Sequence, residues 1–384
     1  MNFLLIYDCI YPESLGGVEY RNHCLAQALV ERGHSVTVAG WVKTLHTPSP
    51  GVTILPLAYI TKIHDGTGQR SALASLRFAA AVACLDITAF DVVETANIPY
   101  VHILPLALRC FWAKKLFIVT WYEFFGPYWR HYKMPIAAPF YRAIEWFCAQ
   151  IGHVNATSPL TGSRLAAARP GSSRSPVPVI PCGVWLRDIQ FATRTPALDA
   201  PTLLYAGRLI PEKRLDLLLQ AVAKLSRTSS RANPILLGIV GDGPDRLRLE
   251  AITASLDITD CVKFYGRIPD IRDMWCLLAG ARIAVQPSAR EGFGLFPLEA
   301  IALARPVVTC ESPDNAVGAI VRDGIEGLCT AASPDALATG LTSLLDDGEL
   351  WSQLSNNAVH RASFYDWPSV AKRIEDLSVH PQTC

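Results

Sequence analysis

The stretch SAREGFGLFPLEAIALARPVV, residues 288–308, places two glutamates, Glu291 and Glu299, around a glycine-containing turn that runs into a helical pattern. Pro297 suits the first turn of a helix, and the LEAIALA that follows has helical character. The free backbone N–H groups at such a helix start lie at the positive end of the helix dipole and can bind an anion. Glu291 is left to accept hydrogen bonds from hydroxyls. The segment therefore suits a ligand that combines phosphate with hydroxyl groups, as a nucleotide sugar does.

A second motif, LLYAGRLIPEKRLDLLLQAV at residues 203–222, predicts a buried strand, a turn at Gly207 and an amphipathic helix. Arg208 and Lys213 fall in the connecting loop, at the carboxyl end of the strand, where open α/β sheets bind ligands. Two cations there can neutralise a diphosphate, and a guanidinium offers a planar fork to its oxygens. The alternative for both motifs is structural, because glycine turns are common in α/β proteins and most Lys and Arg side chains are simply exposed.

The order of apolar runs and helical patterns predicts parallel sheets in two domains. A chain of 384 residues exceeds the usual size of one hydrophobic core. A stretch short of periodicity and rich in proline near its end suggests a linker at 183–201, between a first domain at 1–182 and a second at 202–363. The expected strands are residues 3–7, 36–39, 52–55, 91–94, 116–120 and 154–156, then 202–205, 235–240, 262–265, 283–286 and 307–309.

Composition excludes several classes of protein. The net charge is +1, but residues 1–190 hold 16 Lys and Arg against 11 Asp and Glu, so the amino half favours an anionic partner. No dense basic run or common motif indicates nucleic-acid binding. The 11 cysteines form no C-x-x-C pair and no metal-ligand cluster, which favours a reducing, cytoplasmic setting and no bound metal. The amino terminus lacks a signal-peptide pattern, and the longest apolar stretch falls short of the roughly 20 residues of a membrane span.

Four strings in this order resemble the family 4 retaining glycosyltransferases, also called glycosyltransferase group 1: GRLIPEKRLDLLLQA, VGDGPDRLRLE, FYGRIPDIRDMW and EGFGLFPLEAIALARPVV. The last is similar to that family's signature of two glutamates separated by seven residues. PESLGGVEYRNHCLAQALVERGHSVTV, VIPCGVW and FYDWPSVAKRI extend the similarity over nearly the whole chain. The resemblance implies the GT-B fold, an α/β architecture of two Rossmann-like doubly wound parallel-sheet domains facing across a cleft. The first domain would bind the acceptor and the second the nucleotide sugar, while a helix at 364–384 crosses back to the first.

The resemblance also implies roles for individual residues. Arg208, Lys213 and Glu291 would be catalytic: the two cations stabilise the leaving diphosphate, and Glu291 holds sugar hydroxyls. No protein nucleophile, metal or cofactor is then needed, and UDP and GDP are the expected nucleotides of the donor. Donor binding is implied for a further set of residues: Gly16, Gly17, Gly207, Arg267, Phe293, Gly294, Leu295 and Glu299.

This sequence departs from the family pattern at two positions. Relatives often carry a His before an acidic residue at the end of a strand in the first domain, where it orients the transferred sugar, and Tyr122 stands there before Glu123. A tyrosine with a pKa of about 10 can donate and accept a hydrogen bond but is no general base at neutral pH. Tyr122 and Glu123 are both candidates for the sugar contact. Ala319 occupies a position where glutamate is common.

Six aromatic residues lie within 121–129, followed by Arg130, His131 and Lys133. They either cover one another and close the core, or form an acceptor surface in which rings stack on sugars or enter a lipid interface. Together with the sequence FWAKK at 111–115, they suggest a lipid-linked acceptor and a peripheral contact with the anionic inner face of the plasma membrane.

The resemblance thus implies a retaining, metal-independent hexosyltransferase that moves a sugar from a nucleotide-diphosphate donor to a hydroxyl of a glycan or lipid-linked acceptor, in surface polysaccharide or glycolipid assembly. Three alternatives remain open. A nucleotide-sugar epimerase shares the two-domain architecture, and a catalytically weak nucleotide-sugar-binding protein agrees with Tyr122 and Ala319. An NAD-dependent oxidoreductase is suggested by VGDGP at 240–244, although that turn lacks the third glycine of the dinucleotide fingerprint.

Overall fold

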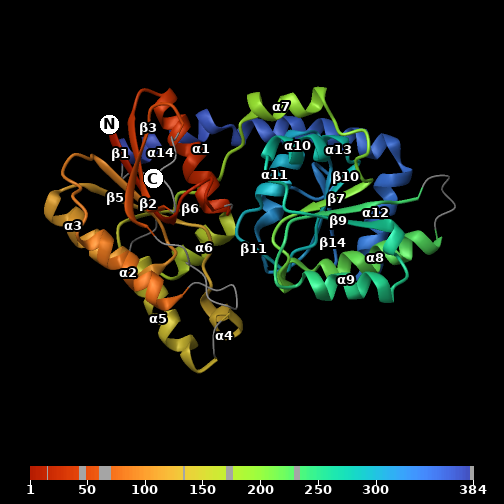
Figure 1. The fold of residues 1–384 in the computed structure, drawn as a ribbon, viewed down its shortest axis with the longest axis horizontal. Coiled ribbons are helices and arrows are strands. Elements are labelled where there is room, and N and C mark those ends of the chain that lie inside the picture. Colours follow the sequence, from red (N-terminus) through yellow and green to blue (C-terminus); the bar gives the residue numbers. More distant parts are fainter. Residues whose placement is uncertain are drawn as a thin grey trace. The chain divides into compact units, whose positions relative to one another are not determined.

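The computed structural model describes residues 1–14, 16–42, 49–59, 71–132, 135–169, 176–228 and 234–380. The chain divides into two compact units (Figure 1). Unit 1 contains residues 1–183 together with the carboxyl-terminal residues from Trp367 onward, and unit 2 contains residues 184–366. No helix of the described ranges combines the length and the apolar character that crossing a bilayer requires.

Unit 1 is built on a six-stranded sheet in which every neighbouring pair is parallel, in the order β3-β2-β1-β4-β5-β6. Its strands are β1 (Asn2–Cys9), β2 (Ser35–Val42), β3 (Val52–Tyr59), β4 (Val92–Ala96), β5 (Leu116–Trp121) and β6 (His153–Ala156). The central strands are buried along almost their whole length, as expected for a parallel sheet covered on both faces. This burial explains why they read as continuous apolar runs in the sequence.

Helices cover the unit 1 sheet. They are α1 (Gly17–Glu31), α2 (Ala72–Ala83), α3 (Ile103–Ala113), α4 (Trp129–Tyr132), α5 (Ala138–Ala149), α6 (Pro159–Ala167) and α14 (Trp367–Val379). Helix α14 packs against α1, so the end of the chain is part of unit 1. The main core combines side chains of β1, β4 and β5 with the inner faces of α2, α3 and α5, among them Leu4, Phe78, Leu106 and Trp121.

Unit 2 repeats the plan with a second six-stranded parallel sheet, in the order β14-β12-β10-β7-β8-β9. Its strands are β7 (Leu203–Ala206), β8 (Leu237–Val240), β9 (Val262–Gly266), β10 (Ile283–Gln286), β12 (Val307–Cys310) and β14 (Gly327–Thr330). Two further strands, β11 (Arg290–Glu291) and β13 (Asp314–Asn315), pair with each other in a separate two-stranded sheet. The helices are α7 (Leu186–Arg194), α8 (Leu215–Thr228), α9 (Arg246–Ser255), α10 (Ile271–Gly280), α11 (Leu295–Ala302), α12 (Pro334–Asp346) and α13 (Gly348–Ala362).

Both units therefore show the strand order of the Rossmann fold, with each half of the sheet wound outward from its centre. The predicted fold class, two doubly wound parallel sheets, is confirmed. Strand β14 was not predicted, because GLCT is a short edge strand whose last three residues are only half buried. The range predicted as a linker contains helix α7, which packs on α10 through a short apolar face that includes Ile189 and Ala192.

Candidate active site

The loop after β7 presents the first predicted cation. Tyr205 is buried at the end of the strand, and its hydroxyl donates to the carbonyl oxygen of Arg208 at 3.0 Å. The Gly207 N–H donates to the carbonyl oxygen of Val240 at 3.0 Å, which ties this turn to the neighbouring strand β8. The Arg208 side chain is exposed. It therefore projects from a fixed backbone at the carboxyl end of a central strand, where doubly wound sheets bind ligands.

The VGDGP turn after β8 packs directly on the Gly207 turn. A Cβ atom at Gly241 would lie 1.9 Å from the carbonyl oxygen of Gly207, and one at Gly243 would lie 2.3 Å from that of Leu209. Gly241 also has a φ of 125°, which disfavours other residues. The two glycines are thus explained by backbone contact between neighbouring loops. That contact accounts for VGDGP without a bound dinucleotide.

Lys213 and Glu291 meet although 78 residues separate them. Lys213 ends a single 3₁₀ turn (Pro211–Lys213), and the Ala289 N–H donates to the carbonyl oxygen of Glu212 at 2.8 Å, which joins the two loops. The Lys213 Nζ lies 2.5 Å from Glu291 Oε2, and both side chains are mostly buried. Gln286, buried at the end of β10, donates from Nε2 to the same carboxylate oxygen at 3.1 Å. Glu291 is therefore held from two sides at the end of the central strand β10.

The turn into α11 has the geometry expected of an anion site. Gly294 has φ 105° and ψ 76°, and a side chain at this position would also approach Val317 Cγ2 at 3.0 Å. Helix α11 begins at Leu295, so its first N–H groups have no acceptor within the helix. Phe293 is buried, with its ring edge-on to Tyr365 at 6.1 Å between centroids. Backbone N–H groups are thus available at a turn that only glycine adopts without strain.

Glu299 lies one turn into α11 and is buried. Its Oε1 accepts a hydrogen bond of 3.2 Å from Trp275 Nε1, on the neighbouring helix α10. Burial raises the pKa of this carboxyl from 4.5 to about 7, and the Trp275 hydrogen bond offsets only part of that rise. Glu299 therefore changes its charge close to neutral pH.

The remaining cation predicted in unit 2, Arg267, follows the edge strand β9 and is exposed. Strands β7, β8, β9 and β10 are parallel neighbours in one sheet, so the loops that follow them lie along the same edge. The structure brings Lys213 and Glu291 into direct contact there. Arg208 and Arg267 are placed on exposed loops of that edge.

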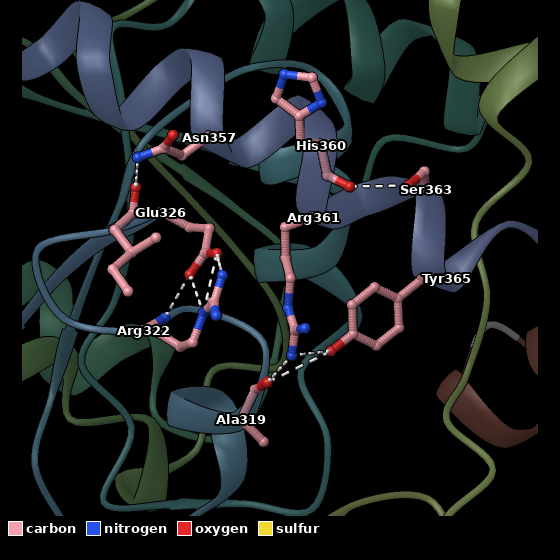
Figure 2. Close-up of polar contacts among 9 residues, drawn as sticks. Ala319, Arg322, Glu326, Asn357, His360, Arg361, Ser363 and Tyr365 are labelled. Atoms are coloured by element: carbon pink, nitrogen blue, oxygen red, sulfur yellow. Dashed lines mark hydrogen bonds and ion pairs between the residues drawn. The ribbon is translucent and has the colours of Figure 1, made fainter.

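Ala319, at the position where glutamate is common among relatives, offers its backbone instead (Figure 2). Its carbonyl oxygen accepts hydrogen bonds from Arg361 Nη2 at 2.7 Å and from the Tyr365 hydroxyl at 3.4 Å. Arg361 Nη2 also donates to the Tyr365 hydroxyl at 3.1 Å. Because the Tyr365 ring also packs on Phe293, Arg361 at the end of α13 and the 3₁₀ turn Ser363–Tyr365 that follows it hold both the α11 turn and the Ala319 turn in place. Sequence reasoning missed Arg361, Tyr365 and Gln286, since these long-range contacts have no local signal.

In unit 1 the predicted glycine turn precedes α1, with Gly16 as its N-cap and Gly17 as its first residue. The Glu19 carboxylate folds back over this turn: a Cβ at Gly16 would lie 2.4 Å from Glu19 Oε2. The Ser14 hydroxyl donates to the other carboxylate oxygen at 2.5 Å. An acidic side chain thus already lies at the positive end of α1, and an incoming phosphate would have to displace it.

Tyr122 and Glu123 follow β5. The Tyr122 ring lies 5.8 Å from the guanidinium of Arg21, which is fully buried and pairs with Glu94 at 2.8 Å. Burial raises the pKa of the Tyr122 hydroxyl further above its ordinary value, so this group is neutral at physiological pH. The Glu123 carbonyl oxygen accepts from Asn97 Nδ2 at 3.1 Å.

The aromatic segment 121–129 closes the core of unit 1. Trp121, Phe125 and Trp129 are all buried. The buried Glu145 carboxylate accepts four hydrogen bonds that anchor this segment and the 3₁₀ turn Tyr100–His102: from the backbone N–H groups of Phe125 and Gly126 at 2.7 Å each, from the Tyr100 hydroxyl at 2.8 Å and from Trp129 Nε1 at 3.1 Å. Of the two interpretations of this segment, the structure supports the core. Lys133 lies outside the described residues.

Comparison with known proteins places these features in a family. Residues 15–187 match the model described as Glycosyltransferase Family 4, and residues 187–361 match the model described as Glycosyl transferases group 1. Among curated proteins, D-inositol 3-phosphate glycosyltransferase 2 of Catenulispora acidiphila is 33% identical over 187 residues, covering 47% of this chain and 43% of that protein. D-inositol 3-phosphate glycosyltransferase of Frankia alni is 35% identical over 187 residues, covering 46% and 44%. The matches thus span less than half the length of these relatives.

Solved structures are similar over the whole chain. HepE of Anabaena, solved in complex with UDP and glucose, has a TM-score of 0.73 at 18% identity and covers 99% of this chain and 100% of its own. Sucrose-phosphate synthase of Thermosynechococcus elongatus has a TM-score of 0.77 at 22% identity, with 99% and 98% covered. At these identities the likeness is one of fold. Two adjoining family models that together span residues 15–361, and two Rossmann-ordered sheets, show that this chain belongs to the family 4 glycosyltransferases of the GT-B fold.

Proposed function

We propose that this protein is a retaining glycosyltransferase that moves a sugar from a nucleoside diphosphate donor to a hydroxyl of a glycan or lipid-linked acceptor, in the assembly of a surface polysaccharide or glycolipid. The observation that carries the proposal is the Lys213–Glu291 contact of 2.5 Å at the ligand-binding edge of the unit 2 sheet. It puts a cation for phosphate beside a carboxylate for hydroxyls. The relatives reported above are named for glycosyl transfer, and HepE was solved with UDP and glucose.

Charge on the departing diphosphate is the main barrier when the anomeric carbon–oxygen bond breaks. Lys213 and Arg208 lower that barrier because their positive charges stabilise the phosphate oxygens as negative charge builds up. The first N–H groups of α11, after Phe293 and Gly294 and beginning at Leu295, bind the same phosphates. Arg267 and the Gly207 turn complete the donor site on this sheet edge. In unit 1, the turn at Gly16 and Gly17 is a further candidate for a phosphate, which would have to displace the Glu19 carboxylate.

Glu291 and Glu299 bind hydroxyls of two different sugars. Glu291 accepts hydrogen bonds from the transferred sugar, and its position is fixed by Gln286 and Lys213. Lys213 has three N–H donors, so one can stay on Glu291 while another reaches a phosphate oxygen. Glu299 accepts from the ribose hydroxyls. Tyr122 and Glu123 are the candidates in unit 1 for a contact with a sugar.

The acceptor hydroxyl attacks the anomeric carbon from the face that the diphosphate leaves, which preserves the anomeric configuration. The bond from the anomeric carbon to the phosphate oxygen breaks, and a bond to the acceptor oxygen forms. The acceptor proton passes to the departing phosphate oxygen. No side chain forms a covalent intermediate, and the cations named above take the role that a metal ion has in other transferases.

A catalytically weak nucleotide-sugar-binding protein is the second candidate. Two observations favour it: the Tyr122 hydroxyl is held neutral by burial, and Ala319 presents a carbonyl that Arg361 and Tyr365 already occupy. A binding protein would bind the nucleotide sugar in calorimetry and leave it unchanged in the presence of acceptors. A transferase would bind it and consume it. An epimerase would instead convert the donor sugar without any acceptor.

A thermal-shift panel of UDP, GDP, ADP and dTDP tests the donor site. A nucleotide at 100 times its Kd should stabilise the protein by about 2.7 kcal/mol. One nucleotide should stand out, and its sugar conjugates then serve as donors in transfer assays, with NMR of the product reporting the anomeric configuration. If none of the four nucleotides stabilises the protein, the proposed donor site is refuted.

A further inference from the structure

Helices α2, α3 and α5 cover one face of the unit 1 sheet, and their inner sides form the core (Figure 1). Their outer sides are also apolar. On α3, the exposed residues Leu104, Leu108, Phe111 and Trp112 follow the spacing i, i+4, i+7 and i+8, which places them in one stripe along the helix. Phe111 and Trp112 are 77% and 73% exposed. A helix that is apolar on both sides needs a second partner besides its own core.

The other two helices of this core also expose apolar side chains. Phe140 and Phe147 lie seven residues apart on the outer side of α5, and Ile136, just before that helix, is 87% exposed. Leu73 and Leu76 are exposed on α2, which packs beside α3. Ten of the twenty exposed large apolar side chains found among the described residues lie on these three helices or at Ile136. We call this the α2–α3–α5 face.

The charges of the α2–α3–α5 face have a single sign. Arg77 on α2, Lys114 at the end of α3 and Arg142 on α5 are exposed. Within the three helices the sole acidic residue is Glu145, and its carboxylate is buried in the core under the four hydrogen bonds described above. The exposed side of these helices is therefore apolar, rich in aromatic rings and positively charged.

We propose that the α2–α3–α5 face docks unit 1 on the surface of an anionic lipid bilayer. Phe and Trp side chains enter the boundary between headgroups and acyl chains, while Lys and Arg side chains at the edge of the apolar stripe meet lipid phosphates. A second copy of this chain is a poorer partner, because a two-fold contact through this face would bring the same cations together. The proposal places the lipid contact on α2, α3 and α5, not on residues 121–129, whose rings fill the core. It does not depend on the proposed transfer reaction.

Sedimentation with vesicles tests this face in the full chain. The protein should bind vesicles of phosphatidylcholine mixed with phosphatidylglycerol, bind pure phosphatidylcholine vesicles much more weakly, and lose affinity as salt rises. The double variant Phe111→Ser, Trp112→Ser should lower the affinity at least about tenfold, because two exposed rings lose their apolar contact. Lys114→Glu with Arg142→Glu should lower it similarly on the anionic vesicles alone.

Leu247→Ser is the matched control, since Leu247 is 80% exposed on α9 of unit 2 and its replacement should leave vesicle binding unchanged. Nucleotide thermal shifts in all variants report unit 2 separately from the lipid contact. Equal binding to neutral and anionic vesicles would overturn the commitment to an anionic surface. An absence of vesicle binding, or a dimer in sedimentation equilibrium that the Phe111→Ser, Trp112→Ser variant dissociates, would overturn the proposal itself.

Discussion

The Glu299→Gln variant should be more stable than the natural protein at alkaline pH and equally stable at acid pH. The folded-state pKa of Glu299 is raised from 4.5 to about 7 by burial, so folded protein holds this proton more tightly than unfolded protein does. The stabilisation from that proton is fully present below about pH 4.5 and is lost as the pH rises through about 7. At about 1.4 kcal/mol per pKa unit, the whole loss is about 3 kcal/mol.

Glutamine keeps an oxygen that can accept the Trp275 hydrogen bond but has no charge to bury, so its stability should not fall over this range. Urea unfolding of both proteins at about pH 5 and about pH 8 measures the difference. From about pH 5 to about pH 8, the free energy of unfolding of the variant should rise by up to about 3 kcal/mol relative to that of the natural protein. A difference between the two proteins that stays constant with pH would refute the account of Glu299.

Nucleotide binding gives a second, opposite readout. In the proposed donor site, ribose hydroxyls donate to the ionised carboxylate, so donor binding should favour the deprotonated form of Glu299. The affinity for the preferred nucleotide should therefore rise with pH through about 7 in the natural protein. Glu299→Gln should bind the nucleotide more weakly, and its affinity should not rise through about pH 7. Because both proteins bind the same diphosphate, this comparison separates the ionisation of Glu299 from that of the diphosphate. The same residue would then lower stability and support binding at neutral pH.

Lys213→Met should lower kcat/KM at least about tenfold to a hundredfold, or roughly 1.4 to 2.7 kcal/mol, and unchanged kinetics in a folded variant would remove its diphosphate role. Glu291→Ala should abolish transfer while calorimetry still shows nucleotide binding; loss of nucleotide affinity alone would contradict its contact with the transferred sugar. Glu145→Ala should destabilise unit 1 by at least about 3 kcal/mol in urea, since it leaves buried donors unpaired, and a change below about 1 kcal/mol would refute that anchor. Gly241→Ala should cost more stability than Gly348→Ala, where a Cβ meets no atom within 4 Å, and equal costs would refute the turn contact.

Sequence patterns predicted those parts of the molecule that depend on local periodicity. The buried strands of both sheets read as apolar runs, and Arg208 and Lys213 lie in the loop after a buried strand, as predicted. The contact between Lys213 and Glu291 was not predicted. Helix α7 was missed because only a short apolar face repeats along it.

Features set by tertiary contacts could not be read from the sequence. The brace from Arg361 and Tyr365 to Ala319 joins residues more than 40 positions apart without a motif. The aromatic run 121–129 had two interpretations, because the sequence does not show that the distant Glu145 carboxylate accepts hydrogen bonds from this segment and anchors it in the core.

The contact between the turns after β7 and β8 limits how this enzyme family member can be re-engineered. Backbone touches backbone where Gly241 and Gly243 meet Gly207 and Leu209, so insertions or bulky replacements in either turn would force the two strands apart. Directed evolution of donor preference therefore has little room there. Gly318 offers more room, because a side chain at this position would meet no atom within 4 Å.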